Sequence, residues 1–303
     1  MQFEYAGFLC SPKNLKMKFL GIFKGIKIIV DFLITFRETL EAALIVGIIL
    51  AYLYKTKNTK YNKVIYSAVG AGLVGSILAA FIFNIFLGSF TGKSEQIFEG
   101  AAMLIGSFLI TTHVFWMMSQ KNIAADLKEK VHSEIKQKDM TGLFLLTFVA
   151  VLREGVETVL FLGAASYVNQ GNRLLAGSLG VLFAIFLGYL LFVASVKIDI
   201  KKFFNASSIL LVLFAAGLAA HGVHELQEAQ ILPTYIEHVW DINPKAPLAE
   251  QGVYPVLHEN GVVGSLAKGL FGYNGNPSLL EVLTYIIYIL AVFLIYKTLK
   301  TSN

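Results

Sequence analysis

The sequence predicts an all-α polytopic membrane protein with seven transmembrane helices, arranged as two inverted three-helix repeats plus a C-terminal helix. The 303 residues are 56% hydrophobic and 15% charged, a composition with which a water-soluble domain could not cover its apolar surface. Apolar stretches of about 20 residues, the length that spans a hydrocarbon core about 30 Å thick, recur along nearly the whole chain. An Arg-Glu-x-x-Glu motif also occurs twice, in stretches that are three spans apart.

The apolar stretches set the boundaries of the predicted segments. The seven predicted spans are 26–54, 64–87, 96–118, 142–167, 174–196, 206–227 and 279–297. The segments are a basic N-terminal leader or interfacial segment at 1–25, repeat 1 at 26–118, a cytoplasmic loop at 119–141, repeat 2 at 142–227, an extracytoplasmic loop at 228–278, and span 7 with its tail at 279–303.

The distribution of basic residues predicts the orientation of the chain in a plasma membrane. Loops 55–63 and 119–141 hold four and five Lys or Arg residues, whereas the alternate loops 88–95 and 168–173 hold one each. Because cytoplasmic loops carry the excess of positive charge, we expect the N-terminus outside and the C-terminus inside. Residues 1–27, with five lysines, oppose this bias. They are interpreted as a leader, a basic interfacial helix, or an extension before a true start at Met17.

The two charged motifs indicate an internal repeat. Span 1 contains Arg37-Glu38-Thr39-Leu40-Glu41 and span 4 contains Arg153-Glu154-Gly155-Val156-Glu157, 116 residues later. Three spans is an odd number, so the two units must cross the membrane in opposite directions. Inverted repeats of this kind are typical of secondary transporters, which bind their cargo near the bilayer midplane between the two halves.

The spacing within each motif predicts an oxygen-rich cation site. Glutamates three apart lie on neighbouring parts of one helical face, and each arginine lies four residues before the second glutamate, within reach of an ion pair. Together the motifs supply four carboxylates, Glu38, Glu41, Glu154 and Glu157, against two supporting guanidiniums, Arg37 and Arg153. Carboxylate oxygens suit a hard cation. The alternative is an ion-paired helix contact, although intramembrane charges cost at least about 2.5–3.5 kcal/mol each.

A second set of candidate metal ligands lies toward the outer face. His221, His224, Glu225 and Glu228 at the end of span 6 fall on one helical stripe, where imidazole and carboxylate could hold a transition metal. The alternative is an ordinary polar helix end. Glu95 and Glu99, at the start of span 3, could form an acidic vestibule with this stripe, although acidic residues at a helix N-terminus need no cargo to explain them.

Other polar and small residues within the spans have simpler interpretations. Asp31 and His113 are single polar residues near span ends, which are more often interface residues than ligands. Gly70, Gly72 and Gly75 in span 2 predict a close helix-packing seam.

The two motifs in a seven-span chain resemble those of the high-affinity iron permease family, which includes fungal ferric permeases and bacterial iron-uptake permeases. The resemblance covers residues 30–297. It also includes Phe98-Glu99-Gly100, Ala216-Gly217-Leu218, Gly222-Val223-His224-Glu225-Leu226-Gln227-Glu228, Leu232-Pro233, Val239-Trp240-Asp241 and Leu270-Phe271-Gly272-Tyr273. It implies inward transport of Fe³⁺ or Fe²⁺, with the four motif glutamates as translocation ligands. Thr39 departs from the glycine that family members often carry there.

The resemblance also implies an extracytoplasmic partner that presents or oxidises iron. We expect a transporter rather than an enzyme, with iron as cargo, no permanently bound cofactor and no nucleic-acid partner. Cys10 is the only cysteine, which excludes a Cys-based metal site, and no nucleotide-binding loop is present in the sequence. The alternatives are transport of another cation, such as manganese or lead, and an intramembrane ferroxidase-type enzyme.

Overall fold

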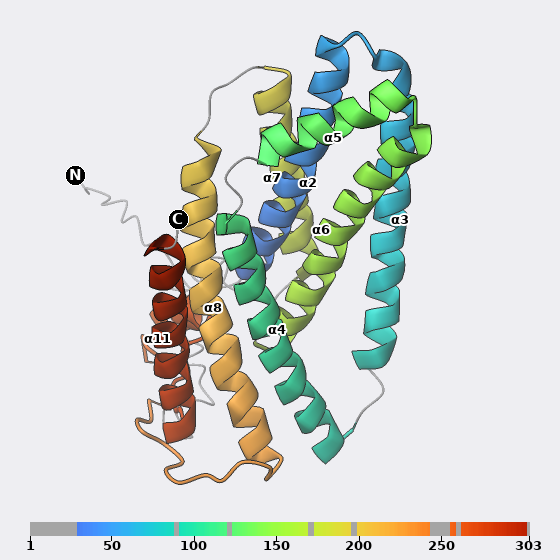
Figure 1. Ribbon diagram of the computed structural model, residues 1–303. Coiled ribbons are helices and arrows are strands. Elements are labelled where there is room, and N and C mark those ends of the chain that lie inside the picture. The colour runs from blue at the N-terminus through green and yellow to red at the C-terminus, as the bar shows by residue number, and fades with distance from the viewer. Residues whose placement is uncertain are drawn as a thin grey trace, which may run out of the picture.

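The computed structural model describes residues 29–87, 91–119, 123–168, 173–194, 199–242, 255–258 and 262–301. The predicted leader, including Cys10 and Met17, lies outside this part of the chain. The described residues form helices joined by turns and short irregular segments, with no strand among them. The long helices lie roughly side by side as a bundle (Figure 1).

The helices follow the predicted spans closely. They are α2 (Ile29–Lys55), the 3₁₀ turn η1 (Thr59–Tyr61), α3 (Asn62–Leu87), α4 (Lys93–Ser119), α5 (Ile123–Gln137), α6 (Met140–Val168), α7 (Arg173–Phe192), α8 (Ile200–Glu228), α10 (Val262–Phe271) and α11 (Leu279–Thr301). Each predicted span overlaps a long helix, namely α2, α3, α4, α6, α7, α8 and α11 in order. The helices α5 and α10 lie in segments that were predicted only as loops.

Five helices of the described chain are long and apolar enough to cross a membrane, and they belong to α3, α4, α7, α8 and α11. The remaining two predicted spans are the motif helices α2 and α6, of 27 and 29 residues. Both exceed the roughly 20 residues that a span requires. Each, however, carries the three charges of its motif near its middle. The count of seven spans therefore stays a prediction.

The bundle is built from pairs of helices. The most extensive contacts join α2 to α7, α3 to α6 and α4 to α8, while α2 also packs against α6 at the centre. Helix α11 packs against α8 at one side of the bundle (Figure 1). Large apolar side chains are exposed on the outer faces, for example Phe81 on α3, Phe186 on α7 and Phe293 on α11. Such broad exposed apolar faces fit contact with lipid rather than water.

Small residues set the closest helix contacts. A Cβ added at Gly72 or Gly75 of α3 would lie 2.8–2.9 Å from side-chain atoms of Val151 or Leu152 on α6, which confirms the predicted seam at those two glycines. Gly70 faces open space instead, so its assignment to the seam was wrong. On α4 and α8, Gly100 and Gly222 each lie against the other's backbone carbonyl.

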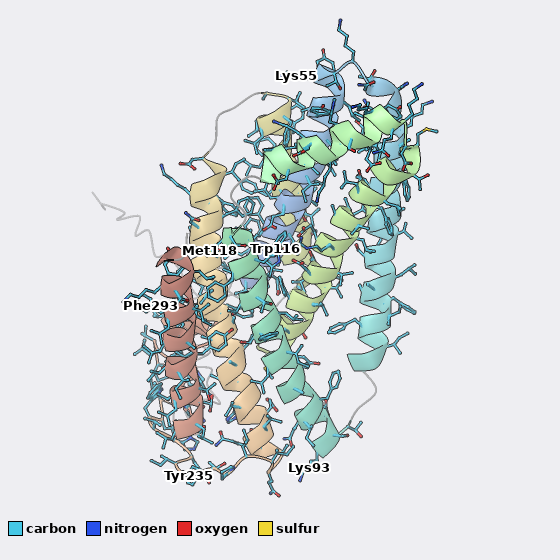
Figure 2. The ribbon with its side chains drawn as sticks, in the orientation of Figure 1. Lys55, Lys93, Trp116, Met118, Tyr235 and Phe293 are labelled. Atoms are coloured by element: carbon cyan, nitrogen blue, oxygen red, sulfur yellow. The ribbon has the colours of Figure 1, made fainter. Side chains whose placement is uncertain are left out.

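The amphipathic helix α5 distinguishes one end of the bundle from the other. Lys55 and the amphipathic helix α5 lie at one end, and Lys93 and Tyr235 lie at the other (Figures 1 and 2). Helix α5 covers its end of the bundle by burying Val131 in a cluster with Ile49, Leu53 and Leu143. The packing therefore anchors α5 to α2 and α6 rather than leaving it as an independent segment.

Candidate metal centre

The first motif lies on α2, and its arginine is completely enclosed. Arg37 Nη1 is 2.7 Å from Glu38 Oε1, and Arg37 Nη2 is 3.0 Å from Glu41 Oε1. Arg37 and Glu38 are both 0% exposed. The expected pair at four-residue spacing is therefore present, and the guanidinium fork also reaches Glu38, the adjacent residue.

The second motif lies on α6 in a more open setting. Arg153 Nε is 2.8 Å from Glu157 Oε1, and Arg153 Nη2 is 3.9 Å from Glu154 Oε1. The Arg153 side chain is 35% exposed, and its guanidinium carbon lies 4.0 Å from the ring centroid of Trp116 on α4. This distance is typical of a cation–π contact.

The contact between α2 and α6 brings the two motifs together. One carboxylate oxygen from each of Glu38, Glu154 and Glu157 can be chosen so that all three lie within 4.8 Å of one another. The buried atoms Glu38 Oε2 and Glu154 Oε2 have no hydrogen-bond partner. Buried carboxylate oxygens that lack a partner are costly, and a bound cation would compensate them.

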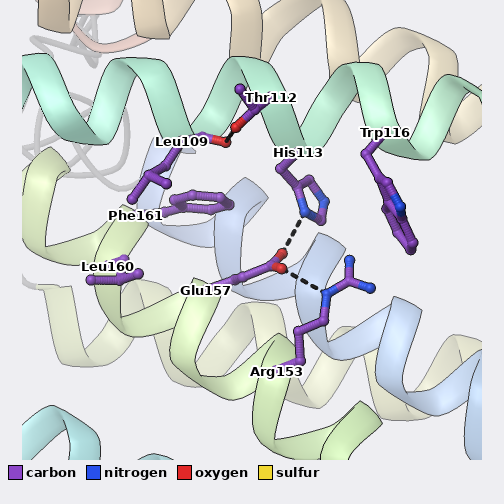
Figure 3. A pocket seen from close by; sticks show the side chains of 8 residues that line it. All are labelled: Leu109, Thr112, His113, Trp116, Arg153, Glu157, Leu160 and Phe161. Atoms are coloured by element: carbon purple, nitrogen blue, oxygen red, sulfur yellow. Dashed lines mark hydrogen bonds and ion pairs between the residues drawn. The ribbon is translucent and has the colours of Figure 1, made fainter.

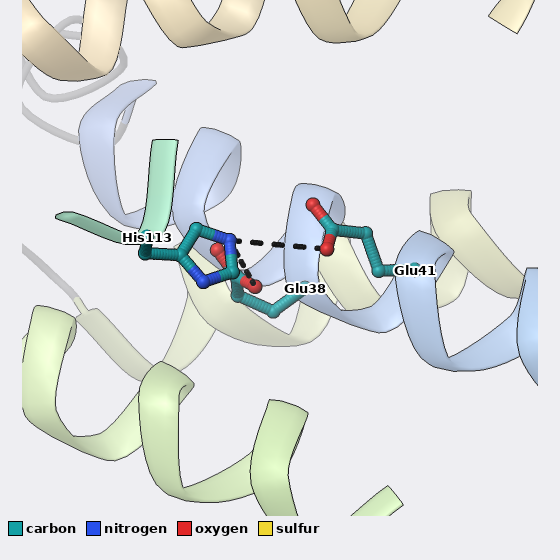
Figure 4. A group of neighbouring side chains, drawn as sticks. All are labelled: Glu38, Glu41 and His113. Carbon is teal, nitrogen blue, oxygen red and sulfur yellow. Dashed lines mark ion pairs between the residues drawn. The ribbon is translucent and has the colours of Figure 1, made fainter. Parts of the chain in front are cut away.

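His113 of α4 completes the cluster from a third helix. Its Nδ1 atom is 2.5 Å from Glu157 Oε2, and its Nε2 atom is 3.8 Å from Glu41 Oε2 and 4.0 Å from Glu38 Oε2. Figure 4 shows the imidazole directed at both glutamates of the first motif. Glu38, Glu41 and His113 form a second group of potential ligand atoms within 4.8 Å. The cluster thus contains two overlapping groups that share Glu38.

The interpretation of His113 as an interface residue was wrong. The side chain is 7% exposed and faces the centre of the bundle. His113 follows Gly106 and Ile110 at helical spacing, and all three are buried. That spacing was the sequence signal that could have placed the imidazole on the inner face. Asp31 is likewise 0% exposed, with Arg173 Nε 4.0 Å from its Oδ2 atom.

A cavity of about 440 Å³ borders the cluster between α4 and α6. His113, Arg153 and Glu157 supply its polar wall (Figure 3). The rest of the lining is Leu109, Thr112, Trp116, Leu160 and Phe161. The cavity places open volume directly beside a carboxylate and an imidazole of the cluster.

The candidate ligands of the outer end form a separate group at the end of α8. His224 Nε2 is 3.2 Å from Glu228 Oε1, and Gln96 on α4 donates a hydrogen bond to Glu228. His221 Nδ1 is 3.1 Å from its own helix carbonyl at Gly217. Glu99 and Glu225 are partly exposed on the facing helices α4 and α8. Among the described residues, no three side chains of this outer group place ligand atoms within 4.8 Å of one another.

Glu281 of α11 is a member of this outer group that the sequence reasoning missed. Its Oε1 atom lies 2.9 Å from His224 Nδ1 and also accepts the backbone N–H of Ser278. Ser278 Oγ in turn accepts the N–H of Glu281, which completes a capping box at the start of α11. The Ser-x-x-Glu spacing before an apolar run was the available signal.

A helical bundle with broad apolar outer faces and a buried cluster of carboxylates, arginines and one histidine indicates a multi-pass membrane protein with a candidate metal site. The chain belongs to the iron permease FTR1 family, whose model matches residues 29–301. This finding confirms the resemblance to the iron permease family.

The relatives carry the same assignment in their names. The chain is 33% identical over 272 residues to the ferrous iron permease EfeU of Escherichia coli O6:K15:H31, with 86% of this chain and 92% of that protein covered. It is 31% identical over 271 residues to the ferrous iron permease EfeU of Yersinia pestis, with 88% and 92% covered. No solved structure matches the chain.

Proposed function

We propose that this protein imports iron across the plasma membrane, and that the cluster between α2 and α6 is the site through which the ion passes. The observation that carries this proposal is the meeting of Glu38 and Glu154, buried on two helices far apart in the sequence, with an unpaired oxygen on each. Family membership and the names of the relatives support iron as the cargo.

The charge balance of the cluster supports a cationic cargo. Four carboxylates against the two guanidiniums of Arg37 and Arg153 leave a formal excess of two negative charges. A divalent iron ion would neutralise them. The two ligand groups share Glu38, so an ion could move from one group to the other without losing contact with that carboxylate. Overlapping sites of this kind lower the cost of dehydration at each step.

The orientation of the helices suggests the direction of transport. With the N-terminus outside, the ends of α4 and α8 that carry Glu99, His224 and Glu228 face the exterior, as does the start of α11. We propose that the outer group, His221, His224, Glu225, Glu228 and Glu99, attracts and first binds iron, with Glu281 orienting the His224 ring. A carboxylate that accepts the N–H of the other ring nitrogen commonly orients a metal-binding imidazole in this way.

The proposal treats iron as cargo rather than as a resident cofactor. An extracytoplasmic protein that presents or oxidises iron would deliver it to the outer group. The motif glutamates then act as ligands and carry out no chemical step. Fe²⁺ and Fe³⁺ both fit carboxylate ligands, so the delivering partner and the conditions outside decide the valence that enters.

Radioactive iron uptake into proteoliposomes carrying this protein alone tests the proposal. Fe²⁺ and Fe³⁺ are offered separately, and manganese and lead are added as competitors. Glu38→Gln and Glu154→Gln should each abolish uptake, because an amide keeps the shape of the side chain and removes the charge. Glu129→Gln, on the exposed face of α5, is the matched control and should transport normally. Normal uptake by both cluster variants would defeat the proposed site.

A further inference from the structure

We infer that His113 is a metal ligand of the central cluster, and that its Nε2 atom gives the iron site a nitrogen donor from a third helix. The inference rests on the function proposed above and deepens it. The motifs alone supply only oxygen donors, and His113 lies outside both of them in the sequence.

The His113 ring lies beside both glutamates of the first motif. His113 Nε2 lies 4.0 Å from Glu38 Oε2 and 3.8 Å from Glu41 Oε2, distances that an ion bound to all three side chains could span once the Arg37 guanidinium moves aside. All three atoms face one point inside the bundle (Figure 4). Glu38 Oε2 is buried there without a hydrogen-bond partner, so the space is bordered by an unsatisfied anionic oxygen.

The contact with Glu157 fixes the tautomer of the His113 ring. Glu157 Oε2 lies 2.5 Å from Nδ1, and an ionised carboxylate can only accept a hydrogen bond. Nδ1 therefore carries the hydrogen, and Nε2 keeps its lone pair directed at the first motif. A carboxylate that fixes the distal nitrogen of a metal-binding histidine is the usual arrangement around protein metal ions. Glu157 of α6 thus orients a ligand for the glutamates of α2.

The Arg37 guanidinium contacts these donor atoms. Arg37 Nη2 lies 3.0 Å from His113 Nε2 and donates to it, and the same guanidinium contacts Glu38 and Glu41. The thioether sulfur of Met117 also lies 2.9 Å from Arg37 Nη2. The guanidinium occupies the centre of a donor set suited to a cation. We infer that Arg37 holds these donors together until iron displaces it from Nε2.

A nitrogen ligand changes which ions the site prefers. Carboxylate oxygens alone suit Ca²⁺ and Mg²⁺ as well as iron, whereas imidazole favours the borderline transition metals. His113 would therefore let the permease admit Fe²⁺ in the presence of the far more abundant Ca²⁺. The competing interpretation is that His113 only bridges α4 to the motif helices through ion pairs, and this predicts no nitrogen bond to the metal.

Pulsed electron–nuclear double resonance on the full chain in lipid nanodiscs distinguishes these interpretations, with Mn²⁺ as the probe. At one Mn²⁺ per protein, we expect a ¹⁴N coupling in the wild type that is lost in His113→Gln. His132→Gln, which changes an exposed histidine of α5, is the matched control and should keep the coupling. The Mn²⁺ affinity of His113→Gln should fall by at least about tenfold, since even residues that only support metal ligands contribute 10–100-fold. Its Ca²⁺ affinity should stay unchanged.

A reciprocal protein covers the case in which His113→Gln does not fold. The five other histidines are replaced by glutamine in this variant, which leaves His113 as the only source of an imidazole nitrogen. They are His132, His221, His224, His238 and His258. The ¹⁴N coupling should persist.

Three outcomes would decide against one or both proposals. A coupling that survives in His113→Gln, or that is missing from the reciprocal protein while Mn²⁺ binds, overturns the role of His113 and leaves the carboxylate site standing. Mn²⁺ binding that Glu38→Gln leaves unchanged overturns the proposed site itself, and the inference fails with it.

Discussion

Arg37 and Arg153 hold the same position in their motifs but have different surroundings. Arg37 is 0% exposed and contacts Glu38, Glu41 and His113. Arg153 is 35% exposed and stacks on Trp116 beside the cavity. At the scale of the residue, therefore, the two motifs are not interchangeable, and the first provides the enclosed half of the cluster.

This asymmetry predicts unequal effects of replacing each arginine by lysine. Arg37→Lys should lower iron uptake by more than about tenfold, because an ammonium cannot reproduce the planar fork that reaches three partners. Arg153→Lys should retain most of the uptake, since Arg153 has one close carboxylate partner and is 35% exposed beside the cavity. Initial rates of radioactive iron uptake, normalised to protein in the membrane, measure both. Equal losses would contradict the assigned asymmetry.

The ion pairs within each motif could be predicted from the sequence. That the two motifs lie together could be predicted as well, but not the individual contacts between them. Arg37 pairs with Glu41 and Arg153 with Glu157 because residues four apart are neighbours on the surface of any α-helix. The place of His113 depends on how α4 rotates about its axis. That rotation is fixed by the crossing of α4 and α8 at Gly100 and Gly222, a contact between distant segments.

At the scale of the helix, glycines of neighbouring helices position both motifs. Gly72 of α3 packs against Val151 and Leu152, the two residues before Arg153. Gly180 of α7 packs against Thr35 and Phe36, the two residues before Arg37. Both contacts are closer than a side chain would allow, so the distance of each motif helix from its neighbour depends on these glycines.

Gly155 of the second motif offers a direct test of this packing. A Cβ at this position would overlap the Ser76 side chain on α3, so Gly155→Ala should push α6 away from α3 and lower both thermal stability and uptake. The double variant Gly155→Ala, Ser76→Gly should recover much of both, because it restores the space. Overpacking of this kind typically costs about 1–3 kcal/mol.

Gly70→Ala is the control for this experiment, because nothing lies within 4 Å of a Cβ added there. It should leave the melting temperature in detergent and the uptake unchanged. Failure of Ser76→Gly to rescue Gly155→Ala would show that the contact does not set the spacing of α3 and α6.

The long apolar helices were predictable, whereas α5 and α10 were not. The charges of α5 suggested a soluble loop, yet Leu127, Val131 and Ile135 recur every four residues along it. That spacing is the signature of an amphipathic helix, and its apolar face packs against α2 and α6. Helix α10 has only 10 residues, and its position depends on the close contact of the following Gly272 with Gly217 of α8.

At the scale of the molecule, the packing pattern agrees with an inverted repeat. If α2, α3 and α4 correspond to α6, α7 and α8, then the contact of α2 with α7 corresponds to that of α6 with α3. The contacts of α2 with α6 and of α4 with α8 correspond to themselves. This is the pattern expected of two halves related by a pseudo-two-fold axis. It supports the predicted repeat, which stays a prediction.

The orientation of the whole bundle is the last prediction. The positive-inside rule places the end with Lys55 and α5 in the cytoplasm and the end with Lys93 and Tyr235 outside. In a Cys10→Ser background, which has no other cysteine, single cysteines at Tyr235 and Lys130 test both faces, because both residues are exposed. A membrane-impermeant maleimide applied to intact cells should label Tyr235→Cys within minutes and Lys130→Cys only after the membrane is permeabilised. The reverse labelling pattern would show that the bundle has the opposite orientation, and the outer group on α8 could then not be the entrance for iron.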